Sequence, residues 1–97
     1  MATYIAFLRW TPQGIQNIKQ SPSRLDAARK AFEAAGLKMT NFYMVTGQYD
    51  MIAILEAPDD LALAKAILAL GSQGSIRTET CRAYTENEYR QIIGGLP

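Results

Sequence analysis

The sequence contains no histidine and only one cysteine among its 97 residues. The absence of histidine removes the side chain that most often serves as a general base near neutral pH and as a metal ligand. A single cysteine excludes a disulfide within the chain, and it excludes an iron–sulfur cluster held by four cysteines of one chain. We therefore expect no metal site and no cofactor.

The chain also lacks a strong excess of charge, with 10 Lys and Arg residues against 9 Asp and Glu residues. Binding to nucleic acid or to a membrane surface needs a basic face, so neither partner is expected. No apolar run approaches the roughly 18–20 residues that cross a bilayer. The first ten residues have neither the charged start nor the cleavage pattern of a signal peptide. These absences predict a cytoplasmic protein.

Composition and length indicate one ordinary folded domain. Hydrophobic residues make up 48% of the chain and charged residues 20%, which are values typical of globular proteins. A chain of 97 residues is about the size of one small domain. We therefore treat residues 1–97 as a single domain.

Apolar periodicity and turn signals predict an alternation of strands and helices. Strands are expected at Thr3–Trp10, Lys38–Thr46, Tyr49–Ala57 and Ser75–Tyr84, and helices from Ser21 or Ser23 to Gly36, from Pro58 to Gly71 and from Thr85 to Gly94. This order is that of a ferredoxin-like α+β sandwich, in which two helices cover one face of a four-stranded antiparallel sheet. A short C-terminal helix follows it.

Local signals fix several of the expected element ends. Ser21 is a candidate cap before Pro22, and Ser23 with Asp26 resembles a capping box. Thr85 and Glu88 have capping-box spacing before the last helix. Two short turns are also expected, one at residues 11–14 and one at residues 47–48, where the second and third strands form a hairpin.

The central strands are apolar on both faces. In the third strand, Met51, Ala53 and Leu55 lie on one face and Ile52 and Ile54 on the other. Two helices cover only one face of a sheet, and an uncovered apolar face marks an interaction surface. We therefore expect a homodimer, alone or as the unit of a higher oligomer, in which two sheets meet as an α/β barrel. The alternative is that the C-terminal helix of the same chain covers this face.

Several short motifs carry a family resemblance. The hairpin contains Gly47-Gln48-Tyr49-Asp50 directly after Phe42-Tyr43, and further matching segments are residues 10–14, 18–24, 56–60, 69–71, 76–78 and 82–85. With these segments the whole chain resembles the GYD-domain family, small proteins with a dimeric ferredoxin-like fold. The resemblance implies the fold and dimerisation, and it implies no settled activity and no agreed catalytic residues.

The Gly47–Asp50 motif has two interpretations. As a structural element it is a hairpin turn, since Gly accepts a positive φ and Asp bonds to local backbone. As a functional element it places Asp50 at the mouth of the sheet, where the carboxylate could act as a general base or bind a ligand donor, with Tyr49 as a donor. Asp50 is the one candidate catalytic residue of the chain.

Aromatic and basic side chains supply the other candidate ligand contacts. Trp10 and Tyr43 lie on neighbouring strands and either line a pocket or seal the core or the dimer seam. Arg9, Arg77 and Arg82 lie within strands, where each needs an acidic partner or an anionic ligand. Glu56, Glu79 and Asp50 are the candidate acidic partners. Cys81 is expected to be a buried, inert thiol, because no histidine can activate it.

Three hypotheses of function follow. The favoured one is a dimeric module that binds or senses a small ligand through Trp10, Tyr43, Tyr49, Asp50 and Arg77. The second is a cofactor-independent enzyme of monooxygenase or isomerase type acting on a small organic molecule, an analogy at the level of fold alone. The third is a purely structural interaction subunit whose interior is filled by its own side chains.

Overall fold

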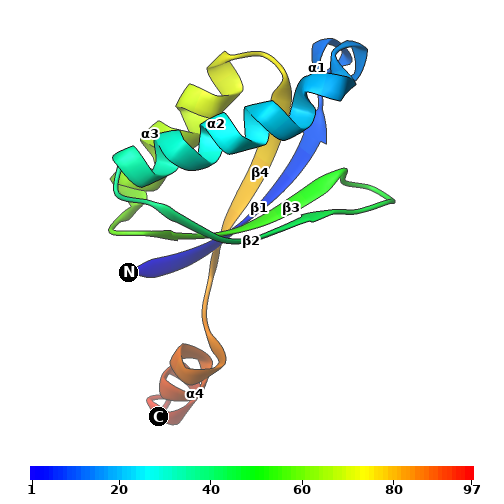
Figure 1. The fold of residues 1–97 in the computed structure, drawn as a ribbon. Helices are drawn as coiled ribbons and strands as arrows, with labels where there is room; N and C mark the ends of the chain where they lie inside the picture. Colours follow the sequence, from blue (N-terminus) through cyan, green and yellow to red (C-terminus); the bar gives the residue numbers. More distant parts are fainter.

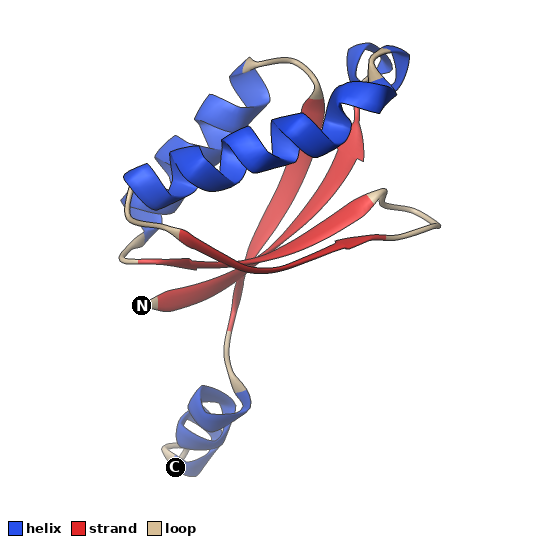
Figure 2. Ribbon diagram, in the orientation of Figure 1, coloured by secondary structure: helices blue, strands red, loops and turns tan.

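A computed structural model describes all residues from Met1 to Pro97. It consists of four strands and four α-helices with one short 3-10 helix (Figure 2). In chain order these are β1 (Ala2–Trp10), α1 (Pro12–Gln16), η1 (Ile18–Gln20), α2 (Ser21–Ala34), β2 (Lys38–Met44), β3 (Met51–Ala57), α3 (Asp60–Ser72), β4 (Ile76–Ala83) and α4 (Glu86–Gly94).

The strands form one antiparallel sheet in the order β2-β3-β1-β4. Helices α2 and α3 lie together on one face of this sheet, and α4 lies on its other side beyond the end of β4 (Figure 1). This arrangement confirms the predicted ferredoxin-like fold. In the sheet, β1 and β3 are the central strands, so their residues decide what each face presents.

The core lies between the sheet and the two long helices. Alternate residues of the central strands point into it, and they are buried with side chains from α2 and α3. Its buried members are Tyr4, Ala6, Leu8, Phe32, Leu37, Met51, Ala53, Leu55, Ala57, Leu63 and Ala66. Burying a side chain such as Leu55 contributes roughly 1.5–3 kcal/mol, so this one layer holds the helices on the sheet.

The ends of α2 differ in part from the prediction. The N-cap residue is Gln20, and Ser23 donates a hydrogen bond to the Gln20 carbonyl, so the expected capping role of Ser21 or Ser23 is wrong. At the other end, Gly36 ends the helix as predicted, with φ of 84°. The amide of Leu37 bonds back to the carbonyl of Phe32, which gives a Schellman motif between two buried side chains.

The two predicted turns differ from the prediction: the first, at residues 11–14, is the start of a short helix, and the second, at residues 47–48, is part of a longer loop. Thr11 caps α1 by accepting a hydrogen bond from the Gly14 amide, so the expected turn begins a short helix. The β2–β3 hairpin closes through residues 45–50, because Met44 and Met51 are its last paired residues. The two-residue turn expected at Gly47-Gln48 is therefore wrong, although Gly47 does adopt a positive φ of 131°.

The sheet face opposite α2 and α3 is open in the single chain. We call it the open face, and its residues are Ile5, Phe7, Arg9, Tyr43, Ile52, Ile54, Arg77, Glu79 and Cys81. Its central isoleucines and Phe7 are only half-buried. The two-sided apolar pattern is thus confirmed, and the alternative that α4 covers this face is wrong, since α4 makes no extensive contact with any other helix or strand. Cys81 is exposed here, which corrects the expectation that it is buried.

Candidate functional site

Tyr49 joins the hairpin loop to the open face. Its ring lies against Phe7, with centroids 4.8 Å apart, and the Arg9 guanidinium carbon lies 4.6 Å from the Tyr49 centroid. The Tyr49 hydroxyl donates a hydrogen bond of 2.8 Å to Glu79. This bond to a carboxylate, together with burial, raises the pKa of the Tyr49 phenol above its usual value. Tyr49 is therefore a protonated donor near neutral pH.

A polar hollow of about 310 Å³ opens beside this contact, lined by Phe7, Arg9, Tyr49, Arg77, Thr78 and Glu79. Arg9 and Arg77 stand directly opposite each other in the β1–β4 ladder, and like charges in that relation repel. Arg9 forms an ion pair of 3.4 Å with Glu79, whereas Arg77 has no acidic partner within the chain. The hollow thus carries one surplus positive charge, which suits an anionic group.

Asp50 is held by backbone groups at the end of β1. Its side-chain Oδ2 accepts a hydrogen bond of 3.1 Å from the Trp10 amide. Its own amide donates to the Leu8 carbonyl, and its carbonyl accepts from the Val45 amide. The first two contacts fasten the hairpin loop to β1, and the third closes the loop on itself. This geometry gives Asp50 a structural role and leaves its carboxylate engaged with the backbone.

The Trp10 side chain lies on the helix-bearing side of the sheet. Its indole donates a hydrogen bond of 3.3 Å to the Ser21 hydroxyl at the start of α2. The ring borders an open apolar hollow of about 270 Å³, which we call the groove, lined by Trp10, Ile18, Ser21, Pro22, Leu25, Phe42, Met44 and Met51. On its rim, Met44 is largely exposed and Ile18 is partly exposed.

The predicted ligand-binding residues therefore do not form one pocket. Tyr49 and Arg77 line the same hollow on the open face. Tyr43 is on that face too, but it pairs with Ile52 and lies nearer the β2 edge, outside the hollow. Trp10 lines the groove on the other side of the sheet, and Asp50 contacts its amide.

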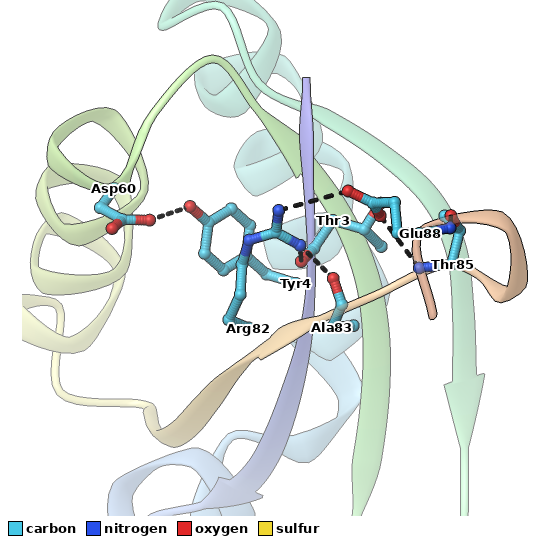
Figure 3. A network of polar contacts seen from close by, with 7 residues as sticks. All are labelled: Thr3, Tyr4, Asp60, Arg82, Ala83, Thr85 and Glu88. Carbon is cyan, nitrogen blue, oxygen red and sulfur yellow. Dashed lines mark hydrogen bonds and ion pairs between the residues drawn. The ribbon is translucent and has the colours of Figure 1, made fainter. Parts of the chain in front are cut away.

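A polar network at the base of α4 escaped sequence reasoning (Figure 3). The Arg82 guanidinium pairs with Glu88 at 3.5 Å and donates to the carbonyls of Thr3 and Ala83. It also faces the Tyr4 ring, whose hydroxyl donates to Asp60. That last bond raises the pKa of the Tyr4 phenol. Two signals were present in the sequence, the capping box and the need of Arg82 for an acidic partner. The contacts with Thr3, Tyr4 and Asp60 had none, because they join residues far apart in the chain.

No three acidic or sulfur side chains come together in a way that could hold a metal ion. None of the helices has the length and apolar character needed to span a bilayer.

Comparison with known proteins identifies the family. A sequence model of the GYD domain matches residues 4–93. The chain belongs to the GYD domain family. A curated relative from Thermus thermophilus, named glutamine synthetase and cystathionine beta-lyase binding protein, is 32% identical over 84 residues, covering 86% of this chain and 88% of the relative.

A solved structure shares the fold. The crystal structure of the protein TTHA0845 from Thermus thermophilus superposes with a TM-score of 0.57 and 24% sequence identity. The match covers 88% of this chain and 95% of that chain. At this level of sequence identity the similarity supports the fold of this GYD-domain chain and gives no information about its ligands.

Proposed function

We propose that this GYD-domain protein is a homodimeric binding module whose partners are metabolic enzymes. The observation that carries the proposal is the relative from Thermus thermophilus, which is named for binding glutamine synthetase and cystathionine beta-lyase. The candidate general base also argues for binding over catalysis, because the Asp50 carboxylate is engaged by the Trp10 amide. This proposal takes up the hypothesis of an interaction subunit.

The surface of the single chain supports self-association. A compact monomer of 10.7 kDa exposes about 5,500 Å², whereas this chain exposes 6547 Å² and buries only 13 of its 97 residues. The excess of about 1,000 Å² exceeds the roughly 800 Å² that each partner buries in a standard interface. Its radius of gyration of 14.7 Å likewise exceeds the roughly 12.5 Å of a compact domain of this length.

Titration with purified enzymes tests the binding function. Glutamine synthetase and cystathionine beta-lyase from the organism that encodes this chain are titrated against the protein labelled at its N-terminus, with fluorescence anisotropy as the readout. The proposal predicts saturable binding of at least one of the two enzymes. An unrelated enzyme of similar size is the control. The proposal is contradicted if the control enzyme gives the same anisotropy change. It is also contradicted if neither enzyme changes the anisotropy up to about 100 μM, since a Kd of that size corresponds to a binding free energy of only about −5.5 kcal/mol.

A second candidate function is the binding of a small anion. The observation that favours it is the hollow at Tyr49 and Arg77, where one guanidinium has no acidic partner. A small carboxylate with an apolar part would pair with Arg77 and contact Phe7. Native mass spectrometry of freshly purified protein tests this function. It predicts an extra mass that disappears in Arg77→Ala, and an unchanged mass in both proteins would exclude a ligand that copurifies.

A further inference from the structure

Helix α4 carries an apolar stripe that nothing in its own chain covers. Tyr89, Ile92 and Ile93 have i, i+3, i+4 spacing, which places them on one side of the helix. Their side chains are 47–56% exposed, and Leu96 just beyond the helix is 62% exposed. Asn87 and Gln91 occupy the opposite side. A short amphipathic helix gains most of its stability from packing that side, so a covering surface is missing.

The orientation of α4 is nevertheless fixed at its base. Thr85 and Glu88 form a complete capping box. The Glu88 carboxylate also pairs with Arg82 (Figure 3). The Arg82 guanidinium lies 4.6 Å from the Tyr84 ring centroid. These contacts tie the first turn of α4 to the last residues of β4. The helix is therefore presented as an arm, held in a defined direction away from α2 and α3 (Figure 1).

The groove is an apolar surface of matching character at the other end of the molecule. Trp10, which borders it, pairs with Ile76 at the start of β4, while α4 follows the end of β4. Those two ends are about 25 Å apart along the strand. Only Tyr84 and Thr85 connect β4 to α4, and two residues reach about 7 Å. The arm therefore cannot fill the groove of its own chain.

We propose that α4 is an exchanged arm whose apolar stripe packs into the groove of a second copy of this chain. The inference rests on the homodimer of the proposed function. With a twofold axis, each chain donates one arm and accepts one arm in its groove. Both arms and both grooves are then covered in a closed dimer. This arrangement requires the two open faces to meet with their strands crossing at a large angle, so that the end of one β4 lies beside the β2 edge of the other chain. The arm then passes round that edge to the groove, which lies on the helix-bearing side of the sheet. Phe42 and Met44 of the groove lie on that edge.

A second copy fits this surface better than an unrelated partner does. The open face and the arm lie on the same side of the sheet (Figure 1), so an occupant of the open face meets the arm as well. The area in excess of a compact monomer, about 1,000 Å², corresponds to one side of a standard dimer interface. The net charge of +1 produces little repulsion between two identical chains.

Disulfide trapping tests the arm. In a Cys81→Ser background, one chain carries Met44→Cys and an N-terminal tag, and a second, untagged chain carries Ile92→Cys. Both replaced side chains are about half or more exposed in the single chain, so neither substitution removes core packing. After mixing and mild oxidation, we expect a covalent heterodimer in which mass spectrometry identifies the 44–92 disulfide.

The matched control replaces Ile92→Cys by Gln91→Cys, on the polar side of the same helix. The proposal predicts at least a tenfold lower yield of heterodimer with Gln91→Cys. Equal yields from the two positions, or no 44–92 disulfide from a protein that is dimeric by light scattering, overturn the arm and leave the dimer standing. A wild-type protein that is monomeric in the same measurement overturns the dimer, and the arm with it.

Discussion

At the scale of single residues, position in the sheet decides what the candidate side chains do. The motif residue Asp50 is a catalytic candidate in the sequence. In the structure its carboxylate accepts a hydrogen bond from the Trp10 amide, which holds the hairpin loop against β1. Its neighbour Tyr49 turns the other way, onto Phe7 and Glu79 of the open face. Two adjacent motif residues therefore serve opposite sides of the sheet.

The role assigned to Asp50 predicts a graded loss of stability. Asp50→Ala leaves the half-buried Trp10 amide without an acceptor, which lowers the free energy of unfolding by about 2 kcal/mol. Asp50→Asn keeps an oxygen acceptor and loses only the charge, so about half that loss is expected. Urea denaturation measures both variants. Equal stability of Asp50→Ala and wild type would contradict a structural role for Asp50.

At the scale of elements, local signals were predictable and distant contacts were not. The capping box of Thr85 and Glu88 and the glycine that ends α2 depend on neighbours within a few residues, and both were predicted correctly. The hairpin loop was predicted too short, because apolar Val45 and Tyr49 resemble strand residues while the paired strands end at Met44 and Met51. Cys81 was predicted buried because the sequence alone does not say on which face of the sheet it lies, and the structure pairs it with Ile5 on the open face.

The candidate site divides in the same way. The alternation of β1 and β3 predicted which residues reach each face, and the structure agrees. The separation of Trp10 from Tyr49 and Arg77 was predictable only in part. Alternation along β1 assigns Trp10 to the same face as Leu8, whereas the pairing of Arg77 with Arg9 follows from the register of β4, which the sequence does not give. The partner of Arg82 was missed for a related reason, because Glu88 lies in another element.

The base of α4 should be sensitive to acid. The Thr85 amide, the Thr85 hydroxyl and Arg82 lower the pKa of Glu88 below its ordinary value of 4.5, with the amide hydrogen bond as the largest cause. A carboxylate with a lowered pKa in the folded state stabilises the helix above its unfolded pKa, and this contribution is lost as the pH falls through the folded value. We therefore expect α4 to loosen below pH 4.5.

The Cα chemical shift of Ile92, followed by NMR during acid titration, measures that loosening. In Glu88→Gln the acid transition of α4 should be absent, because glutamine carries no titrating proton. Glu86→Gln is the matched control, since Glu86 lies in the same first turn but pairs with Arg90 instead of Arg82. The same transition in Glu88→Gln as in wild type would show that another group controls α4.

At the scale of the whole molecule, the single chain is an incomplete packing unit. One sheet face is covered by α2 and α3, the other face is apolar and open, and α4 stands apart from both (Figure 1). We propose that a GYD-domain chain of this shape completes its packing by binding another protein surface. Self-association through the open face is the central claim, because both the arm and the enzyme-binding role depend on which surfaces the dimer leaves free.

Native mass spectrometry of the wild-type chain tests that claim most directly, with Ile54→Asp as the companion variant. Ile54 is only half-buried in the single chain, so the variant keeps the core intact while placing a charge on the open face. The account predicts twice the 10.7 kDa chain mass, or an even multiple of it, for wild type and the single-chain mass for Ile54→Asp. A wild-type protein that is monomeric at micromolar concentration, or an Ile54→Asp variant that stays dimeric, would contradict it.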